Sequence, residues 1–164
     1  MLENNILGLK EISKLRNMSF FIPAYQRGYR WGKKEVEDLL NDINEFTPVP
    51  VYNTSEKTWY CLQPIIVKKI SDNRYEVIDG QQRLTTIYLV LHFFNQIMAE
   101  EYREKIFSLE YETRNNIPEF LSTINKNTIN YDNIDFCHIS EAFSTICNWF
   151  SKPNYNRNEF QSKF

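Results

Sequence analysis

The 164-residue sequence has little glycine, few cysteines and no long apolar run. Its four glycines and six prolines exclude collagen-like and Pro/Gly-rich low-complexity proteins. No stretch of about 18 apolar residues occurs, so we expect no transmembrane helix. The N-terminus, MLENNILGLK, lacks the basic start and the long apolar run of a signal peptide. We therefore expect a cytoplasmic protein.

Cysteine and histidine are too sparse for the common metal and nuclease sites. The three cysteines, Cys61, Cys137 and Cys147, are odd in number, and no two stand at C-x-x-C spacing. They are typical of reduced, mostly buried thiols, so neither a disulfide framework nor a zinc site is expected. The two histidines, His92 and His138, are far apart, which excludes a His-Asn-His nuclease site. We expect both to be packed or hydrogen-bonded.

The sequence contains enough apolar residues to form a sizeable core. Hydrophobic residues make up 42% of the chain, so wholesale disorder is not expected, and the length fits one domain of ordinary size. The formal charge of −2 argues against a general polyanion binder, but it leaves local charged patches open.

Hydrophobic periodicity predicts both helices and strands. Helices are expected over residues 7–16, 34–46, 84–98, 118–124 and 139–150. Strands are expected over residues 20–22, 59–70, 74–78 and 105–113. The turn Ser71-Asp72-Asn73 predicts an antiparallel hairpin, and helix 84–98 is apolar on most faces and should be the buried centre. Residues 125–133 are expected as a loop, and residues 151–164 are polar with scattered aromatics.

The segment IPAYQRGYRW combines flat rings with positive charge. Its aromatic and basic residues interleave as Tyr25, Arg27, Tyr29, Arg30 and Trp31. Guanidinium groups can hold phosphate bidentately and aromatic faces can stack on a base, so an anionic ligand with a flat ring would suit this pattern. The alternative is a strand-to-helix connection whose aromatics fill the edge of the core and whose arginines are solvated. Composition alone favours this alternative.

The segment DGQQRLTT lies where an extended run ends and the apolar helix begins. A helix N-terminus offers free backbone N–H groups and a positive dipole end to a phosphate. Gly80 would allow close approach to a ligand, Arg83 could complete the charge pairing, and Asp79 could hold a bridging Mg²⁺. In the alternative, Asp79 caps the helix, the glutamines are solvated and Arg83 pairs with a surface acid. Because such caps are common, spacing alone favours the alternative.

A weaker pattern places two acids on alternate residues of a predicted strand. Glu110 and Glu112 could supply a second set of ligands, although the pattern favours the simpler interpretation, a surface β-edge. No HEXXH, GxSxG or Walker A pattern occurs.

The two motifs together resemble the N-terminal domain of GmrSD-type restriction endonucleases. IPAYQRGYRW comes first, and WYCLQPIIV then leads into YEVIDGQQRLTT, in the order of that family. The resemblance covers about residues 6 to 100, and LEYETRNNIPEFL and NIDFCHISEAFSTICNWF resemble the continuation seen in many members. Where many members have a Gly-Ser pair before the second motif, this chain has Gln63-Pro64.

The resemblance implies an α+β fold related to the ParB/sulfiredoxin-like superfamily. A small mixed β-sheet with packed helices would form a nucleotide-binding core over residues 1–100, and a mainly helical extension would cover residues 101–164. Such proteins are typically prokaryotic factors that restrict phage or modified DNA. DNA cleavage usually belongs to a separate C-terminal domain with a His-Asn-His-type site. We therefore expect a fragment that stops before that nuclease domain.

The resemblance also points to residues of both motifs, and we assign roles to them as hypotheses. Arg27 and Arg83 would contact phosphate, Asp79 would hold Mg²⁺ or the attacking water, and Gln81 and Gln82 would orient phosphate or water. The remaining nucleotide-binding candidates are Tyr25, Gln26, Arg30, Trp31 and Gly80.

Three hypotheses follow. The first is a regulatory domain that binds and, with Mg²⁺, hydrolyses a nucleoside triphosphate, gating a nuclease in an antiphage restriction system. The second is a DNA-binding module that uses Arg30, Lys33 and Lys34 on the DNA backbone without turnover. The third is DNA nicking by this domain itself. The partners expected are the nucleotide, DNA reached through the full-length protein, and a second copy of the chain.

Overall fold

The computed structural model describes residues 12–52, 58, 60–130, 133–153 and 156–161. Its sheet has four strands in the order β2-β3-β1-β4. They are β1 (Ser19–Ile22), β2 (Ile66–Ser71), β3 (Arg74–Asp79) and β4 (Ser108–Tyr111). Strand β1 is parallel to β3 and β4, and β2 is antiparallel to β3. The predicted mixed sheet and its hairpin are confirmed.

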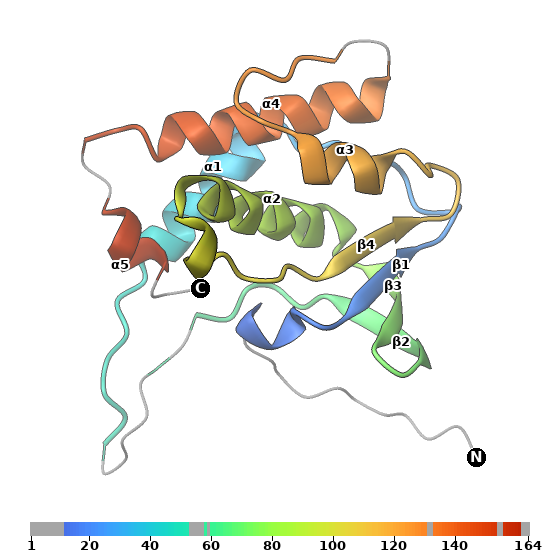
Figure 1. Cartoon of the computed structure of the whole chain (residues 1–164). Coiled ribbons are helices and arrows are strands. Elements are labelled where there is room, and N and C mark those ends of the chain that lie inside the picture. The colour runs from blue at the N-terminus through green and yellow to red at the C-terminus, as the bar shows by residue number, and fades with distance from the viewer. Residues whose placement is uncertain (1–11, 53–57, 59, 131–132, 154–155, 162–164) are drawn as a thin grey trace.

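The helices lie mainly on one side of this sheet (Figure 1). They are α1 (Lys33–Glu45), α2 (Gln81–Ile97), α3 (Ile117–Thr123), α4 (Ile134–Trp149) and α5 (Arg157–Gln161). Two 3₁₀ turns, η1 (Ile12–Leu15) and η2 (Glu100–Tyr102), complete the described elements. Helix α4 packs against α1, α2 and α3. The chain is therefore an α+β protein, as predicted.

The core forms between the alternating apolar residues of the strands and the helices. On the sheet, the buried side chains are Phe20, Ile22, Tyr75, Val77, Leu109 and Tyr111. Helix α2 buries side chains on most of its faces, among them Leu84, Ile87, Leu89, Val90, Phe93 and Phe94. The prediction that this helix is the centre of the domain is confirmed. None of the described helices combines the length and apolarity that a membrane span requires.

Several element boundaries differ from the prediction. Helix α2 begins at Gln81 rather than at Leu84, because Gly80 turns the chain with a φ of 90° directly after β3. The run predicted as β from Trp59 is a strand only from Ile66, and Trp59 itself lies outside the described residues. Of the helix predicted over 7–16, residues 7–11 are not described and the remainder is the turn η1.

The polar segment after Phe150 contributes to the core. It contains α5, whose Phe160 is completely buried. The Phe160 ring packs at 4.9 Å from the ring of Phe150 and at 5.4 Å from that of Trp149. This polar stretch thus contains a short helix that buries an aromatic side chain, which a count of polar residues does not reveal.

Sheet and core both extend across residue 100, the predicted limit of the nucleotide-binding core. Strand β4 pairs with β1 at the edge of the sheet, and α4 packs on α1 and α2. Residues from both predicted segments therefore share one sheet and one buried cluster.

Candidate functional site

Two glutamines of the second motif bind the backbone of the first. Gln82 donates from Nε2 to the carbonyl oxygen of Gly28 (2.9 Å) and accepts from the backbone N–H of Arg30 (2.7 Å). Gln81 donates from Nε2 to the carbonyl oxygen of Arg27. Both glutamines are buried. The alternative in which they are solvated is wrong, since both satisfy backbone groups of the loop that contains the first motif.

Two threonines of the same motif hold tyrosine hydroxyls. The Oγ1 atoms of Thr86 and Thr85 lie 2.8 Å from the hydroxyls of Tyr29 and Tyr111, respectively. Each threonine also donates to a carbonyl oxygen one turn earlier in α2, so the tyrosine is the donor in each pair. Burial raises the pKa of both phenols, for Tyr111 to about 12. Both tyrosines therefore stay protonated and keep donating.

The N-terminus of α2 carries no side-chain cap. Its N-cap residue is Gly80, and no side chain accepts a hydrogen bond there. The alternative in which Asp79 caps the helix is therefore wrong. The left-handed backbone at Gly80 favours glycine, and a Cβ there would also crowd Ile65, whose Cα would lie 3.1 Å away. The first-turn amides of α2 thus have no capping side chain to compete with an anion.

Arg83 is held by the segment that leads into β2. Its Nη1 donates to the carbonyl oxygens of Gln63 (2.9 Å) and Pro64 (3.3 Å), and its Nη2 donates to Oε1 of Gln63 (2.6 Å). The alternative in which Arg83 pairs with a surface acid is wrong. The hydrogen-bond acceptors of Arg83 therefore belong to Gln63 and Pro64, the pair that stands where many members of the resembling family have Gly-Ser.

Two charged side chains of the motifs remain available. Arg27 and Asp79 are exposed, and within the described part of the chain neither side chain makes a hydrogen bond or ion pair. Beside them, Tyr25 is 66% exposed and donates its hydroxyl to Glu76 at 3.2 Å. Gln26 donates to the carbonyl oxygen of Ile78 at 2.7 Å, which ties the loop to β3. Tyr25, Gln26 and Arg27 lie in the loop after β1, and Asp79 is the last residue of β3, directly before Gly80 and α2.

Arg30 has a partner that the sequence did not suggest. Its guanidinium forms an ion pair with Asp135 of α4, and the other oxygen of Asp135 accepts from Nε of Arg114 at 2.6 Å. Arg30 also donates to the carbonyl oxygen of Tyr29. A phosphate role for Arg30 stays a prediction, and it would require this pair to open. The one sequence signal for Asp135 is an acid in the first turn of an apolar helix, which is a common and unspecific feature.

The two alternating acids, Glu110 in β4 and Glu112 directly after it, have structural partners. Glu110 accepts from Oγ of Ser19 (2.6 Å) and from Nη2 of Arg74 (2.7 Å), and Glu112 accepts from the backbone N–H of Ala24 (2.7 Å). Strand β4 is at the edge of the sheet, as the simpler interpretation expected. The described residues contain no group of three or more His, Cys, Asp or Glu that could hold a metal ion. A Mg²⁺ on Asp79 would therefore need phosphate oxygens or waters as further ligands.

The histidines and cysteines behave largely as expected. Nε2 of His92 lies 2.9 Å from the carbonyl oxygen of Ile124, and His138 is half-buried beside Glu141. All three cysteines are free thiols. The prediction that they are mostly buried is wrong for Cys61, which is exposed because the segment before β2 lies on the surface.

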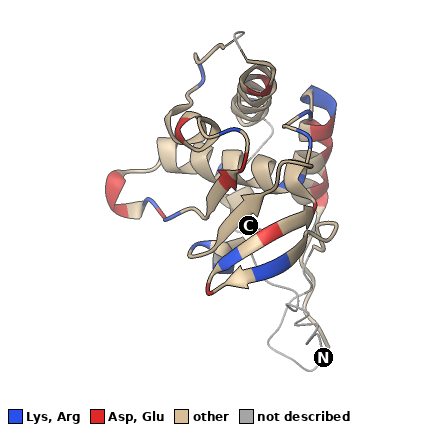
Figure 2. Ribbon diagram, turned by 90° about the vertical axis from the view of Figure 1, so that its right-hand side faces the viewer, with Lys and Arg blue, Asp and Glu red and all other residues tan. Residues whose placement is uncertain are grey.

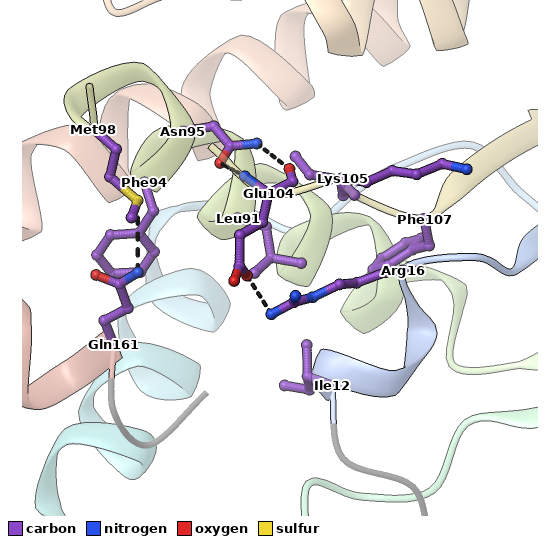
Figure 3. A pocket seen from close by; sticks show the side chains of 11 residues that line it. Ile12, Arg16, Leu91, Phe94, Asn95, Met98, Glu104, Lys105, Phe107 and Gln161 are labelled. Atoms are coloured by element: carbon purple, nitrogen blue, oxygen red, sulfur yellow. Dashed lines mark hydrogen bonds and ion pairs between the residues drawn. The ribbon is translucent and has the colours of Figure 1, made fainter. Parts of the chain in front are cut away.

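A cavity of about 200 Å³ lies elsewhere, beside the C-terminal half of α2 (Figure 3). Leu91, Phe94 and Met98 form part of its lining, and the ion pair of Arg16 with Glu104 spans one side. No residue of either motif lines it.

The comparisons with known proteins agree with the motifs. None of the curated proteins matches this chain. A family model described as the N-terminal domain of GmrSD restriction endonuclease matches residues 7–163, which includes both motifs, β4, α4 and Asp135. The chain therefore belongs to the family of GmrSD restriction endonuclease N-terminal domains.

Proposed function

We propose that this chain binds a nucleoside triphosphate at the N-terminus of α2 and, with Mg²⁺, hydrolyses it. It would act as a regulatory domain of a phage- or modified-DNA restriction system in which another domain cuts the DNA. The observation that carries the proposal is the meeting of both motifs at an uncapped helix N-terminus, beside Arg27 and Asp79, whose side chains have no partner among the residues that the structure describes.

Phosphate binding follows from the backbone first. The dipole and the first-turn amides of α2 attract an anion, and the left-handed turn at Gly80 leads the chain directly into that first turn. Arg27, whose carbonyl oxygen accepts from Gln81 in that first turn, has an exposed guanidinium for bidentate phosphate contact. The exposed ring of Tyr25 offers a face on which a base can stack.

Asp79 fits the proposed metal ligand. It is the last residue of β3, it precedes the phosphate-binding turn directly, and its carboxylate is exposed. Mg²⁺ commonly uses one or two carboxylates together with phosphate oxygens and waters, so a single aspartate is sufficient. The metal would supply charge neutralisation on the phosphates. Asp79 would hold it and orient the water that attacks.

The buried side chains of the second motif take a different role in this proposal. Gln81 and Gln82 fix the loop that carries Arg27, and so they act on the ligand through that loop rather than by touching phosphate or water. Arg83 secures Gln63 and Pro64 against the turn at Gly80 and adds positive charge to the first turn of α2.

Phosphate release by the purified chain, assayed with Mg²⁺ and each of the four ribonucleoside triphosphates, tests this function. We expect turnover of at least one nucleotide and its loss in Asp79→Asn. Asp72→Asn is the matched control, because Asp72 is an exposed acid in the β2–β3 turn that pairs only with Lys69 among the described residues. Equal turnover in both variants, or none in the wild type, would refute hydrolysis by Asp79.

DNA binding without turnover is the competing function. Lys33 and Lys34 are exposed at the start of α1, but Arg30 is engaged by Asp135. Figure 2 shows basic and acidic residues intermixed along the strands and along a helix in that view. Salt-dependent DNA affinity together with no response to nucleotide would favour this function instead.

A further inference from the structure

We propose that Asp135 is a positioning residue of the nucleotide site, which fixes from α4 the loop that presents Arg27. The inference rests on the proposed function for its ligand, but its structural basis is separate. It extends the site beyond residue 100 and gives the second half of the chain a direct part in it.

Asp135 is a buried anion between two cations. Its side chain is 6% exposed, and its two oxygens pair with Arg30 from the first motif and Arg114 from the segment after β4. Its own position is set by the start of α4, where its backbone N–H donates to Oδ1 of Asn133 at 2.8 Å. The helix dipole also favours an acid at this place. The position of Asp135 is therefore set by α4 itself and does not depend on its contact with the loop.

The carboxylate lies directly against the backbone of the loop. A Cβ on Gly28 would lie 1.8 Å from Oδ1 of Asp135, closer than any side chain permits. The glycine of YQRGYRW is thus explained by the space that Asp135 occupies. Gln82 holds the same backbone through Gly28 and Arg30. The loop is consequently fixed by α2 and by α4, while the guanidinium of Arg27 stays exposed.

Removing the charge of Asp135 should loosen this arrangement. Arg30 and Arg114 would then be two half-buried like charges without a counter-ion, and they would repel each other. Arg30 would leave its place beside Gly28, and the loop would lose its tie to α4 while keeping its hydrogen bonds to α2 and β3. Because a mobile loop must be ordered when ligand binds, affinity should fall.

The test uses the whole chain with Asp135→Asn, and Asn41→Ala as the matched control. Asn41 accepts from Nε1 of Trp149 at 2.9 Å, so this control loosens α4 at its other end. Without nucleotide, we expect amide hydrogen exchange over residues 26–30 to become about tenfold faster in Asp135→Asn. By calorimetry with Mg²⁺ and the triphosphate that the wild type binds, affinity should fall about tenfold. Asn41→Ala should change neither quantity more than about twofold.

Unchanged loop exchange in Asp135→Asn would overturn the inference, and so would an equal effect of both variants. Tighter binding in Asp135→Asn would also overturn it, because a released Arg30 would then be a better ligand than the fixed loop. If the wild type binds no triphosphate but the loop exchanges faster only in Asp135→Asn, the proposed function fails and Asp135 still positions the loop.

Discussion

Gln82 uses both ends of its side-chain amide on the backbone of the first motif, and Thr86 holds the hydroxyl of Tyr29 nearby. At the scale of the residue, most side chains of the motif DGQQRLTT therefore make hydrogen bonds within the protein. The groups left over for a ligand are the side chains of Arg27 and Asp79 and the turn at Gly80.

Gln82→Ala should strongly destabilise the chain. The carbonyl of Gly28 and the N–H of Arg30 would lose their partner in a buried place, at a cost of about 3 kcal/mol in the free energy of unfolding. Gln26→Ala, which removes one half-exposed hydrogen bond to Ile78, should cost about 1 kcal/mol or less. Urea unfolding of both variants measures the difference. Equal costs would show that the buried amide does not hold the loop.

Gly28 and Gly32, which lie between β1 and α1, offer a second comparison. Gly28→Ala would place its methyl group 1.8 Å from Oδ1 of Asp135, so the carboxylate must move and its ion pairs weaken, at a cost of about 3 kcal/mol. In Gly32→Ala the nearest atom is Oε2 of Glu35 at 3.5 Å, and the cost should stay below about 1 kcal/mol. Thermal unfolding of the pair checks this order, and a tolerated Gly28→Ala contradicts the contact with Asp135.

The sequence could identify the residues at this scale better than their roles. Arg27, Asp79 and Gly80 could be proposed because arginine, a carboxylate and a glycine at a helix start have a local chemical meaning. The roles of Gln82 and Arg30 depend on residues far along the chain. Nothing within the neighbouring residues shows that Arg30 meets Asp135, so that pairing could not be predicted from the sequence.

At the scale of the element, α2 links the site to the core. Its first turn belongs to the second motif and binds the backbone of the first, and its later turns pack against α4. The apolar run over residues 84–98 predicted this helix, but the prediction missed its first three residues, Gln81, Gln82 and Arg83. All three are polar, and Gln81 and Gln82 are also buried, a combination that hydrophobic patterns cannot detect.

His92 in α2 should make stability depend on pH. Burial lowers its pKa, so the unfolded chain binds more protons than the folded chain as the pH falls below about 6.5. The stability that neutral His92 contributes is present above that pH and is lost as the pH falls through the folded pKa. Urea unfolding at pH 7.5 and 5.5 should show a smaller loss for His92→Gln than for the wild type. The carboxylates are common to both proteins, so an equal loss would contradict the assignment.

At the scale of the whole molecule, the second half of the chain completes the first. Strand β4 extends the sheet, α4 supplies Asp135, and α5 closes the core with Phe160. The α+β class and the mixed sheet could be predicted from the sequence, since they follow from alternation and periodicity. The closure by α5 could not, because scattered aromatic residues in a polar stretch give no periodic signal.

Phe160→Ala should cost about 3 kcal/mol or more, because it opens a cavity among the rings of Phe94, Trp149 and Phe150. Tyr102→Ala, at a site 64% exposed, should change stability by about 0.5 kcal/mol or less. The denaturant midpoints of the two variants measure this difference in stability. A small effect at Phe160 would mean that α5 does not belong to the folded core.

Backbone amide chemical shifts, followed while Mg²⁺ and a nucleoside triphosphate are titrated into the chain, test the proposed site most directly. The amides of Gly80, Gln81, Gln82 and Arg83 should shift most, together with that of Arg27, and the shifts should saturate. They should be much weaker in Arg27→Ala. An absence of shifts with all four ribonucleoside triphosphates, or shifts confined to the cavity beside Leu91 and Met98, would contradict a nucleotide site at the start of α2.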